Sequence, residues 1–290
     1  MAFDRRLTPA RTDLAADHLR GQVEAARFVA GTRRRVIETA IALRREPDPA
    51  CGIDTEAIYG EEVMVYDEVE GWTWGQLARD GYVGWMSAEG LGMPLAATHR
   101  VTALRSFIYP VPSIKQPPLT ALTLGSELAL ERQEGLFLAV AGGGFVFARH
   151  VAPLGTIEHD PVAVAERFLG VPYLWGGKTS LGLDCSALVQ TALYACGTPF
   201  ARDSDLQERE AGESIDPAAG LQAFRRGDLL FWKGHVALVR DAETMIHATG
   251  HTMTVTIEGL AEGIARIAAA GDALRSVKRL GARVASPAPV

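Results

Sequence analysis

A repeat in the first half of the chain constrains the fold more strongly than any other feature of the sequence. Three motifs recur in the same order at offsets of 61, 65 and 63 residues: Leu43-Arg44 as Leu104-Arg105, Gly60 as Gly125, and Gly81-Tyr82-Val83 as Gly144-Phe145-Val146. Between them lie short stretches of alternating hydrophobic and polar residues, interrupted by Gly and Pro. Such alternation is typical of small antiparallel β-barrels, so the repeat predicts two copies of one small β unit.

The rest of the chain divides around this repeat. We interpret residues 30–96 and 97–152 as the two barrels, and residues 1–29 as a leader arm with some helical pattern. Residues 151–155 have the composition of a linker, and the pattern changes after them, so residues 155–285 are expected to form a separate domain. A chain of 290 residues is long enough for two or three domains.

The last of these regions has the pattern of an α+β domain. Asp160 is expected to cap a helix that Gly170 ends, and Asp184 to cap a second helix that Gly197 ends. Tight polar turns then separate four stretches that predict an antiparallel meander, at residues 228–232, 235–240, 244–249 and 252–257. The predicted fold class is therefore α+β, with two small β-barrels in front of the α+β domain.

Composition excludes several classes of partner. The net charge is −6 and Lys and Arg form no basic face, so we expect no nucleic-acid partner. No apolar run is long enough for a signal peptide or a membrane span, which predicts no membrane partner and a cytoplasmic location. The three cysteines, Cys51, Cys185 and Cys196, are an odd, small number and are expected to be reduced thiols.

Cys185 stands at the predicted start of a helix, where free N–H groups and the helix dipole favour an anion. Such a setting lowers the pKa of a thiol and makes it reactive, although a lone cysteine is more often a small buried apolar residue. His235 and His247 change that balance, because they lie on neighbouring predicted strands and can share one face of the sheet. One histidine can take the thiol proton while the other holds its ring in place.

A metal site is a second interpretation of the same residues. Cys185, His235, His247 and His251 are all ligand types. Only His247 and His251 are close in sequence, and a strand does not bring residues four apart together as a helix does. We therefore predict no metal and no cofactor.

Three segments together resemble the NlpC/p60 family of cell-wall peptidases: PYLWGGKTSLGLDCSALVQ at 172–190, GDLLFWKGHVALV at 227–239 and MIHATG at 245–250. The resemblance covers the whole predicted α+β domain and implies a papain-like fold. It also implies that Cys185 is the nucleophile, His235 the base and His247 the residue that orients it. Tyr173 matches a family tyrosine that lines the site, and Ala187 departs from the Gly of many members.

The repeat extends the resemblance to a subgroup of the family that has two bacterial SH3-like barrels before the peptidase. Members of that subgroup are similar to γ-D-glutamyl-diamino acid endopeptidases. The resemblance implies cleavage of short peptidoglycan peptides with a free N-terminal L-Ala, between D-Glu and the diamino acid, in recycling of wall fragments. It implies that the substrate-binding residues are Ser186, Asp203, Ser204, Glu61 and Tyr82.

Other functions remain open at this point. A thiol amidase or acyltransferase would use the same triad, and a non-catalytic protein that binds cell-wall peptides would share the fold. The sequence leaves open which diamino acid is recognised, how long the peptide is and whether the chain forms oligomers.

Overall fold

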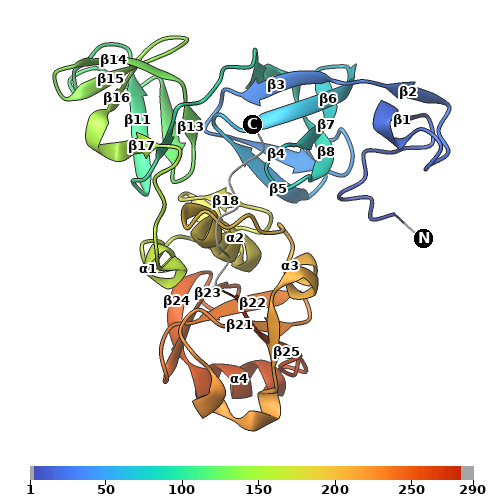
Figure 1. The fold of residues 1–290 in the computed structure, drawn as a ribbon, viewed down its shortest axis with the longest axis vertical. Helices are drawn as coiled ribbons and strands as arrows, with labels where there is room; N and C mark the ends of the chain where they lie inside the picture. The colour runs from blue at the N-terminus through green and yellow to red at the C-terminus, as the bar shows by residue number, and fades with distance from the viewer. Residues whose placement is uncertain (1–2, 282–290) are drawn as a thin grey trace. The chain divides into compact units, whose positions relative to one another are not determined.

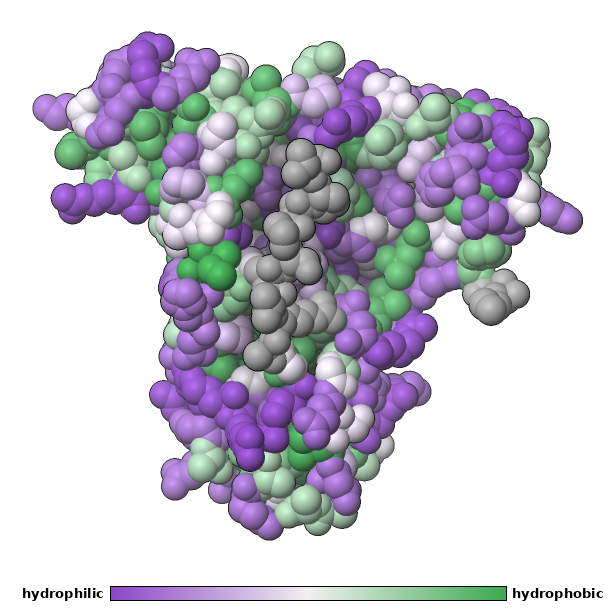
Figure 2. Space-filling model, in the orientation of Figure 1, coloured by the Kyte–Doolittle hydropathy of each residue, from purple (hydrophilic) through white to green (hydrophobic). Residues whose placement is uncertain are grey.

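The computed structural model describes residues 3–281, which fall into two compact units. The division lies between Thr156 and Ile157. In Figure 1 the first unit runs from blue to green and consists of β-sheets, while the second runs from yellow-green to red and combines helices with a sheet. On the visible face of each unit, hydrophilic and hydrophobic residues are interspersed (Figure 2).

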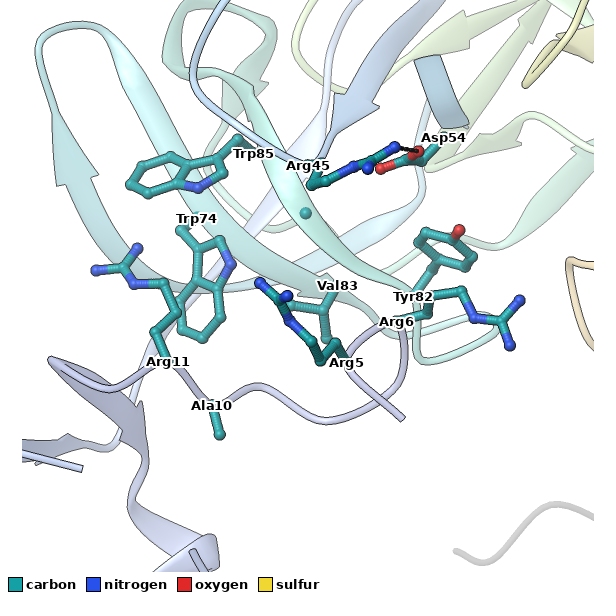
Figure 3. A pocket seen from close by; sticks show the side chains of 11 residues that line it. Arg5, Arg6, Ala10, Arg11, Arg45, Asp54, Trp74, Tyr82, Val83 and Trp85 are labelled. Atoms are coloured by element: carbon teal, nitrogen blue, oxygen red, sulfur yellow. Dashed lines mark ion pairs between the residues drawn. The ribbon is translucent and has the colours of Figure 1, made fainter. Parts of the chain in front are cut away.

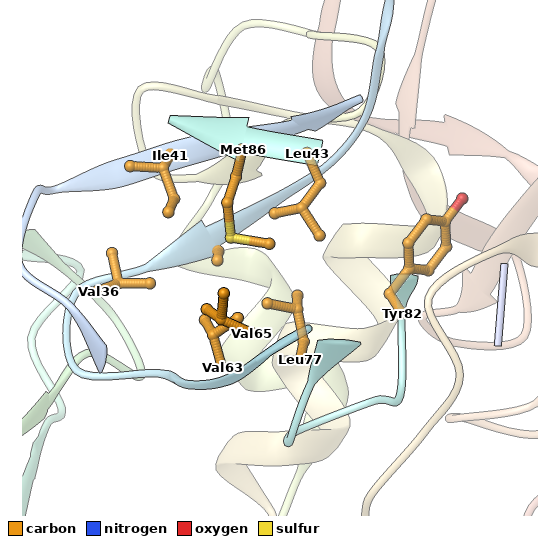
Figure 4. Close-up of a cluster of buried hydrophobic side chains, with 9 residues drawn as sticks. Val36, Ile41, Leu43, Val63, Val65, Leu77, Tyr82 and Met86 are labelled. Carbon is orange, nitrogen blue, oxygen red and sulfur yellow. The ribbon is translucent and has the colours of Figure 1, made fainter. Parts of the chain in front are cut away.

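The first repeat forms one open antiparallel sheet of seven strands, in the order β5-β4-β8-β7-β6-β3-β9. Alternating hydrophobic side chains of these strands, among them Leu43, Val63 and Leu77, meet in a buried core (Figure 4). This core comes from the period of two along each strand. The strands are β3 (Thr32–Val36), β4 (Ala40–Arg44), β5 (Ile53–Ile58), β6 (Glu62–Val69), β7 (Trp72–Leu77), β8 (Val83–Ser87) and β9 (Leu91–Gly92).

The second repeat forms a sheet of three strands, β13-β10-β17, and one of five, β12-β11-β16-β15-β14. Val101, Ile108 and Leu122 are buried at the centre of its core. Its strands are β10 (His99–Val101), β11 (Arg105–Tyr109), β12 (Thr120–Thr123), β13 (Glu127–Leu128), β14 (Leu130–Glu134), β15 (Phe137–Val140), β16 (Phe145–Phe147) and β17 (Val151–Pro153).

Turn geometry matches between the two repeats. Gly60 and Gly125 have φ angles of +87° and +86°, and Gly81 and Gly144 have +75° and +91°. A short 3-10 helix also follows the same strand in each copy, η2 (Ala88–Gly90) after β8 and η3 (Ala148–His150) after β16. The glycines recur because each turn needs a left-handed residue that other side chains adopt only with strain.

The two repeats form small antiparallel β units, as predicted, but their sheets do not close into barrels. The hydrogen-bonded order of each sheet runs from one edge strand to another, from β5 to β9 in the first repeat and from β12 to β14 in the largest sheet of the second. In the first repeat the edge strand β9 is only two residues long. A strand of that length offers too few backbone groups to close the sheet on itself.

The segment expected as a leader arm with some helical pattern forms mainly short strands in its described part. The described part of this segment contains β1 (Leu14–Ala16), the 3-10 helix η1 (Asp17–Leu19) and β2 (Arg27–Val29), with β1 and β2 paired in parallel. Leu14, Ala16 and Leu19 are buried in one cluster with Tyr66, Trp74 and Trp85 of the first repeat. Burial against these large aromatic rings outweighs a weak helical pattern in the sequence.

A pocket of about 270 Å³ lies between this N-terminal segment and strands β7 and β8 (Figure 3). Arg11 stacks over the rings of Trp74 and Trp85 at its wall, 4.5 and 4.8 Å from their centroids. Most of its positive charge is already paired, since Arg6 contacts Asp4 and Arg11 contacts both Asp13 and Asp67. The stacking and ion pairs of Arg11 beside this pocket therefore hold the N-terminal segment against the sheet.

The second unit is an α+β domain whose sheet has the order β20-β25-β21-β22-β23-β24. Figure 1 shows α2 and α4 on opposite sides of this sheet, and Leu260 of α4 is buried with Leu230 and Trp232. Its elements are α1 (Pro161–Glu166), β18 (Lys178–Thr179), β19 (Gly182–Leu183), α2 (Cys185–Ala195), α3 (Ser204–Glu210), β20 (Glu213–Ile215), η4 (Pro217–Ala219), η5 (Leu221–Ala223), β21 (Leu229–Trp232), β22 (His235–Val239), β23 (Thr244–Thr249), β24 (Thr254–Gly259), α4 (Leu260–Ala269) and β25 (Ser276–Arg279).

The predicted helix starts and the meander are confirmed here. Asp160 caps α1 by accepting hydrogen bonds from two backbone N–H groups, and Asp184 caps α2. Helix α1 ends at Glu166, earlier than the expected Gly170, and β24 begins two residues later than expected, after Met253 at φ +54°. Among residues 3–281, no helix is long and apolar enough to cross a membrane.

Candidate active site

Cys185 is the first residue of α2 and is buried, with 5% of its surface exposed. Its Sγ atom lies 4.0 Å from the carbonyl oxygen of Gly234, in the turn just before β22. The Asp184 carboxylate holds this helix start by accepting hydrogen bonds from the N–H groups of Ala187 at 2.8 Å and Gly176 at 3.0 Å. The first turn of the helix and the adjacent loop are therefore fixed around the thiol.

Arg202 is a buried cation beside the nucleophile that the sequence analysis missed. It is 1% exposed and contacts both carboxylate oxygens of Asp184, at 2.9 and 2.8 Å. It also donates to the hydroxyl of Ser186 and the carbonyl of Gly177. The one sequence signal for Arg202 is its position directly before the predicted substrate-binding pair Asp203-Ser204. Since Arg202 neutralises Asp184, that carboxylate opposes ionisation of the thiol less strongly.

His235 and His247 lie together, as their predicted strands required. His235 opens β22 and His247 lies in the neighbouring strand β23, with Leu238 paired to Ile246. His235 Nε2 and His247 Nδ1 are 2.9 Å apart, within hydrogen-bond distance. His247 is fully buried, and Trp232 packs beside the His235 ring at 5.6 Å between centroids. His247 is therefore placed to orient the His235 ring.

Glu258 and Arg266 extend this pair and were not foreseen. Glu258 Oε2 lies 3.2 Å from His247 Nε2, and Arg266 contacts the two Glu258 oxygens at 2.7 Å each. Strand alternation contains a signal for Glu258: His247 is paired with Thr256, and Glu258 lies two residues further on the same face. Arg266 is on helix α4, which the sequence analysis did not predict.

Burial favours the neutral forms of all three triad side chains. It raises the pKa of the Cys185 thiol to about 12, with the Asp184 charge adding to the effect. Burial lowers the pKa of His235 to about 3 and that of His247 to about 4. The carboxylate of Glu258 acts in the opposite direction on both histidines. At neutral pH the free site therefore holds a thiol next to an uncharged imidazole that can accept its proton.

Tyr173 lies close to the nucleophile. It is half-buried and pairs in a single β-bridge with Leu183, two residues before Cys185. Its pKa is raised mainly by burial, and further by the neighbouring charges of Cys185 and Asp184. The hydroxyl is therefore protonated at neutral pH and available as a hydrogen-bond donor at the site.

The residues of the second unit that are expected to bind substrate differ from one another in burial and in their hydrogen bonds. Ser186 is buried, and its hydroxyl donates to Asp184 at 3.0 Å. Asp203 and Ser204 stand at the start of α3 and are half-buried, and the Asp203 side chain makes no hydrogen bond that caps the helix. Asp203 and Ser204 are thus partly exposed, whereas Ser186 belongs to the network that holds the helix start.

Glu61 and Tyr82 belong to the first unit. The Glu61 carboxylate is buried and lies 2.8 Å from Arg79, and Arg79 also contacts Glu127. Tyr82 is 4% exposed and packs in the core cluster of the first repeat (Figure 4). Within their own unit both side chains have structural contacts, and a role in substrate binding stays a proposal.

The alternative of a metal site gains no support from the histidine contacts. Both ring nitrogens of His247 face protein groups, His235 on one side and Glu258 on the other. Coordination of a metal by His247 would break one of these contacts. Across residues 3–281, no group of three or more His, Cys, Asp or Glu side chains is arranged to hold a metal ion.

Comparisons with known proteins agree with this fold. The model of the NlpC/P60 family matches residues 170–269, and that of the bacterial dipeptidyl-peptidase Sh3 domain matches residues 43–91. The γ-D-glutamyl-L-lysine dipeptidyl-peptidase of Bacillus subtilis (strain 168) is 31% identical over an alignment of 235 residues that covers 73% of this chain and 77% of that protein. Dipeptidyl-peptidase 6 of Lysinibacillus sphaericus is 27% identical over an alignment of 259 residues that covers 78% of this chain and 91% of that protein.

A solved structure shares the fold. The crystal structure of an NlpC/P60 family protein from Bacillus cereus ATCC 10987 has a TM-score of 0.71 and 21% identity, and the match covers 86% of this chain and 99% of that one. The chain therefore belongs to the NlpC/P60 family of cysteine peptidases.

Proposed function

We propose that this protein hydrolyses the bond between γ-D-Glu and the diamino acid of short peptidoglycan peptides that carry a free N-terminal L-Ala. The observation that carries the proposal is the contact of His235 with His247 next to Cys185, in a chain that matches dipeptidyl-peptidases over most of its length. Those relatives are named γ-D-glutamyl-L-lysine dipeptidyl-peptidase and dipeptidyl-peptidase 6.

The reaction runs through a thioester. Cys185 Sγ attacks the γ-carbonyl carbon of D-Glu while its proton passes to His235. The C–N bond then breaks as His235 returns that proton to the leaving amine of the diamino acid. Water attacks the thioester, with His235 again taking a proton, and releases L-Ala-D-Glu with the thiol restored. The backbone N–H of Cys185 and the hydroxyl of Tyr173 are the donors that we assign to the developing oxyanion.

We assign recognition of the substrate's free amine to Asp203 and Ser204, and we propose that Glu61 and Tyr82 of the first unit also take part in substrate binding. An ammonium group requires carboxylates and hydroxyls around it, and a closed pocket excludes peptides with a longer or blocked N-terminus. The partial exposure of Asp203 and Ser204 supports their part in this assignment. Ser186 contributes by holding the helix start through Asp184.

We further propose that the peptides are imported wall fragments and that the protein recycles them in the cytoplasm. The three cysteines all lie in the described part of the chain, and none forms a disulfide. Unpaired thiols are typical of a reducing compartment. Cell fractionation with an antibody to the protein tests the location, and recovery in the external fraction would contradict it.

Mass spectrometry tests the proposed specificity. The purified protein is incubated with L-Ala-γ-D-Glu-meso-diaminopimelate and with its N-acetylated form. We expect L-Ala-D-Glu to be released from the free peptide only. The Asp203→Ala variant should lose the preference for the free amine, whereas Asp205→Ala, which removes an exposed neighbour paired with Arg209, should retain it.

The outcomes separate the proposal from its alternatives. Equal cleavage of both peptides would contradict the amine pocket. Transfer of the dipeptide to an added amine in place of water would identify an acyltransferase. No reaction with either peptide, with Cys185 shown to be alkylatable, would favour a binding protein.

A further inference from the structure

Glu258 stands at the outer end of a line of contacts that begins at the catalytic base. His235 Nε2 contacts His247 Nδ1 at 2.9 Å, and His247 Nε2 contacts Glu258 Oε2 at 3.2 Å. Arg266 donates a hydrogen bond to each oxygen of the Glu258 carboxylate, both at 2.7 Å. Strand β24 and helix α4 thus hold a carboxylate against a histidine that is itself completely buried.

The carboxylate determines which nitrogen of His247 carries a proton. The ion pair with Arg266 lowers the pKa of Glu258, so the side chain is ionised at neutral pH and can only accept. The facing nitrogen, Nε2 of His247, must then bear the hydrogen. His247 Nε2 is buried and makes no hydrogen bond of ordinary geometry, so the 3.2 Å ion-pair contact with Glu258 is its polar neighbour. The reverse arrangement would set a lone pair against a negative charge beside a buried ring.

The position of the proton on His247 in turn determines which nitrogen of His235 is protonated. With its proton on Nε2, His247 has a lone pair on Nδ1 and accepts a hydrogen bond there. The nitrogen that faces it, Nε2 of His235, must therefore be the donor. This leaves Nδ1 of His235 without a proton.

Because Nε2 of His235 faces His247, Nδ1 is the nitrogen that remains for the thiol. The thiol contacts the two residues that flank His235 in the chain, since Cys185 Sγ lies 4.0 Å from the Gly234 carbonyl and takes a backbone hydrogen bond from Val236. We infer that Glu258, anchored by Arg266, is a positioning residue that fixes the protons of both histidines and leaves His235 Nδ1 as the base for Cys185. This inference rests on the proposed thiol chemistry.

Charged groups around the two rings set the expected pH response. Glu258 and Asp184 stabilise a protonated His235, whereas His247 and Arg266 oppose it; His247 also faces His251. Replacing Glu258 by Gln removes a negative charge, so the pKa of the base falls. The acid limb of the rate profile, where the base becomes protonated, should therefore move to lower pH.

Nitrogen-15 NMR of protein with labelled histidines tests the proton positions directly and needs no peptide substrate. We expect the wild-type protein to show one tautomer for each of His235 and His247, with the hydrogen on Nε2 in both. In Glu258→Gln both rings should shift towards a mixture of tautomers. A hydrogen on Nδ1 of either ring in the wild type, or no change in Glu258→Gln, would overturn the inference.

Kinetics supply the second test, with Glu262→Gln as a matched control. Glu262 is an exposed acid in the first turn of α4, while Glu258 lies just before that helix. We expect Glu258→Gln to lower kcat on the order of 10- to 100-fold with little change in KM, and to move the acid limb down by about one pH unit. Glu262→Gln should match the wild type. A uniform loss of rate with an unmoved acid limb would show a merely structural role.

Alkylation of Cys185 by iodoacetamide distinguishes failure of this inference from failure of the proposed function. The reaction reports thiol activation by His235 without any peptide. At pH 7 we expect slower alkylation in Glu258→Gln than in Glu262→Gln and the wild type. Equal rates in all three proteins would contradict the role of Glu258 even if the peptide were cleaved, and a difference would support it even if no peptide were cleaved.

Discussion

At the scale of single residues, burial decides the protonation of the catalytic group. Burial is the largest influence on two imidazoles and a thiol, and it holds each in its neutral form. In the proposed mechanism the nucleophile is therefore generated by proton transfer to His235 as the substrate is attacked, not stored as an exposed thiolate. A neutral thiol resists oxidation better than a thiolate, because the thiolate is the reactive species.

The low pKa of His247 makes the free energy of unfolding depend on pH. In the unfolded chain a histidine binds a proton below about pH 6.5, whereas folded His247 stays neutral down to about pH 4. Stability therefore falls as pH decreases through this window, by about 2 kcal/mol at pH 5 from this residue. Urea unfolding at pH 7 and pH 5 should show a smaller loss for His247→Asn than for the wild type. An equal loss in the two proteins would contradict the assignment.

At the scale of elements, the start of α2 depends on a buried ion pair. Arg202, just before α3, reaches Asp184, which caps α2 and directly precedes the nucleophile. Removing one partner leaves the other charge buried without compensation. The pair therefore couples the position of α3 to the position of the thiol.

Arg202→Met should lower the free energy of unfolding by about 3 kcal/mol or more. Arg209→Met is the control, because Arg209 makes an exposed pair with Asp205 within α3 and should change stability by less than about 1 kcal/mol. Denaturant unfolding of both variants measures the difference. Equal effects would mean that the buried pair does not hold the helix start.

The repeat provides a matched pair of glycines for a second test. Gly60 and Gly125 have nearly the same positive φ, but an added Cβ at Gly60 would lie 2.0 Å from the Glu127 carbonyl oxygen, while one at Gly125 meets nothing closer than 3.6 Å. Gly125→Ala should cost about 1–2 kcal/mol from backbone strain alone. Gly60→Ala should lower the free energy of unfolding by clearly more, because the backbone at Glu127 must also move. Thermal unfolding of both variants checks this order, and the reverse order would refute it.

The helix starts could be predicted from neighbouring residues in the sequence. The residues that the sequence did not predict make contacts with distant parts of the chain. Asp160 and Asp184 were recognisable as caps because a cap acts on the two or three residues that follow it. Arg202 reaches a partner eighteen residues away, and Glu258 acts through a neighbouring strand. Such pairs depend on the packed fold and leave no pattern in the linear sequence. The open sheets were missed for the same reason, since alternation does not say whether edge strands meet.

At the scale of the whole molecule, each unit has hydrophobic cores of its own. Among the described residues, the first unit holds buried clusters around Leu43, Ile108 and Trp74, and the second holds one around Leu230, Trp232 and Met245. A core in each unit favours independent folding. Residues 153–157, where the chain passes from one unit to the other, are exposed throughout.

Limited proteolysis should therefore cut first within residues 153–157 and release two resistant fragments. The exposed backbone there admits a protease, whereas each core protects the chain on either side. Mass spectrometry of the fragments locates the cut. A first cut inside β21–β23, or complete digestion without stable fragments, would contradict the division into two units.

The proposed mechanism requires Cys185 to form a thioester with the γ-carboxyl of D-Glu. The most direct measurement is the intact mass of protein quenched in acid during turnover of L-Ala-γ-D-Glu-meso-diaminopimelate, with Cys185→Ala alongside. We expect the mass of one L-Ala-D-Glu acyl group added to the wild-type protein, and no adduct or product with Cys185→Ala. Release of L-Ala-D-Glu by Cys185→Ala at the wild-type rate would contradict it.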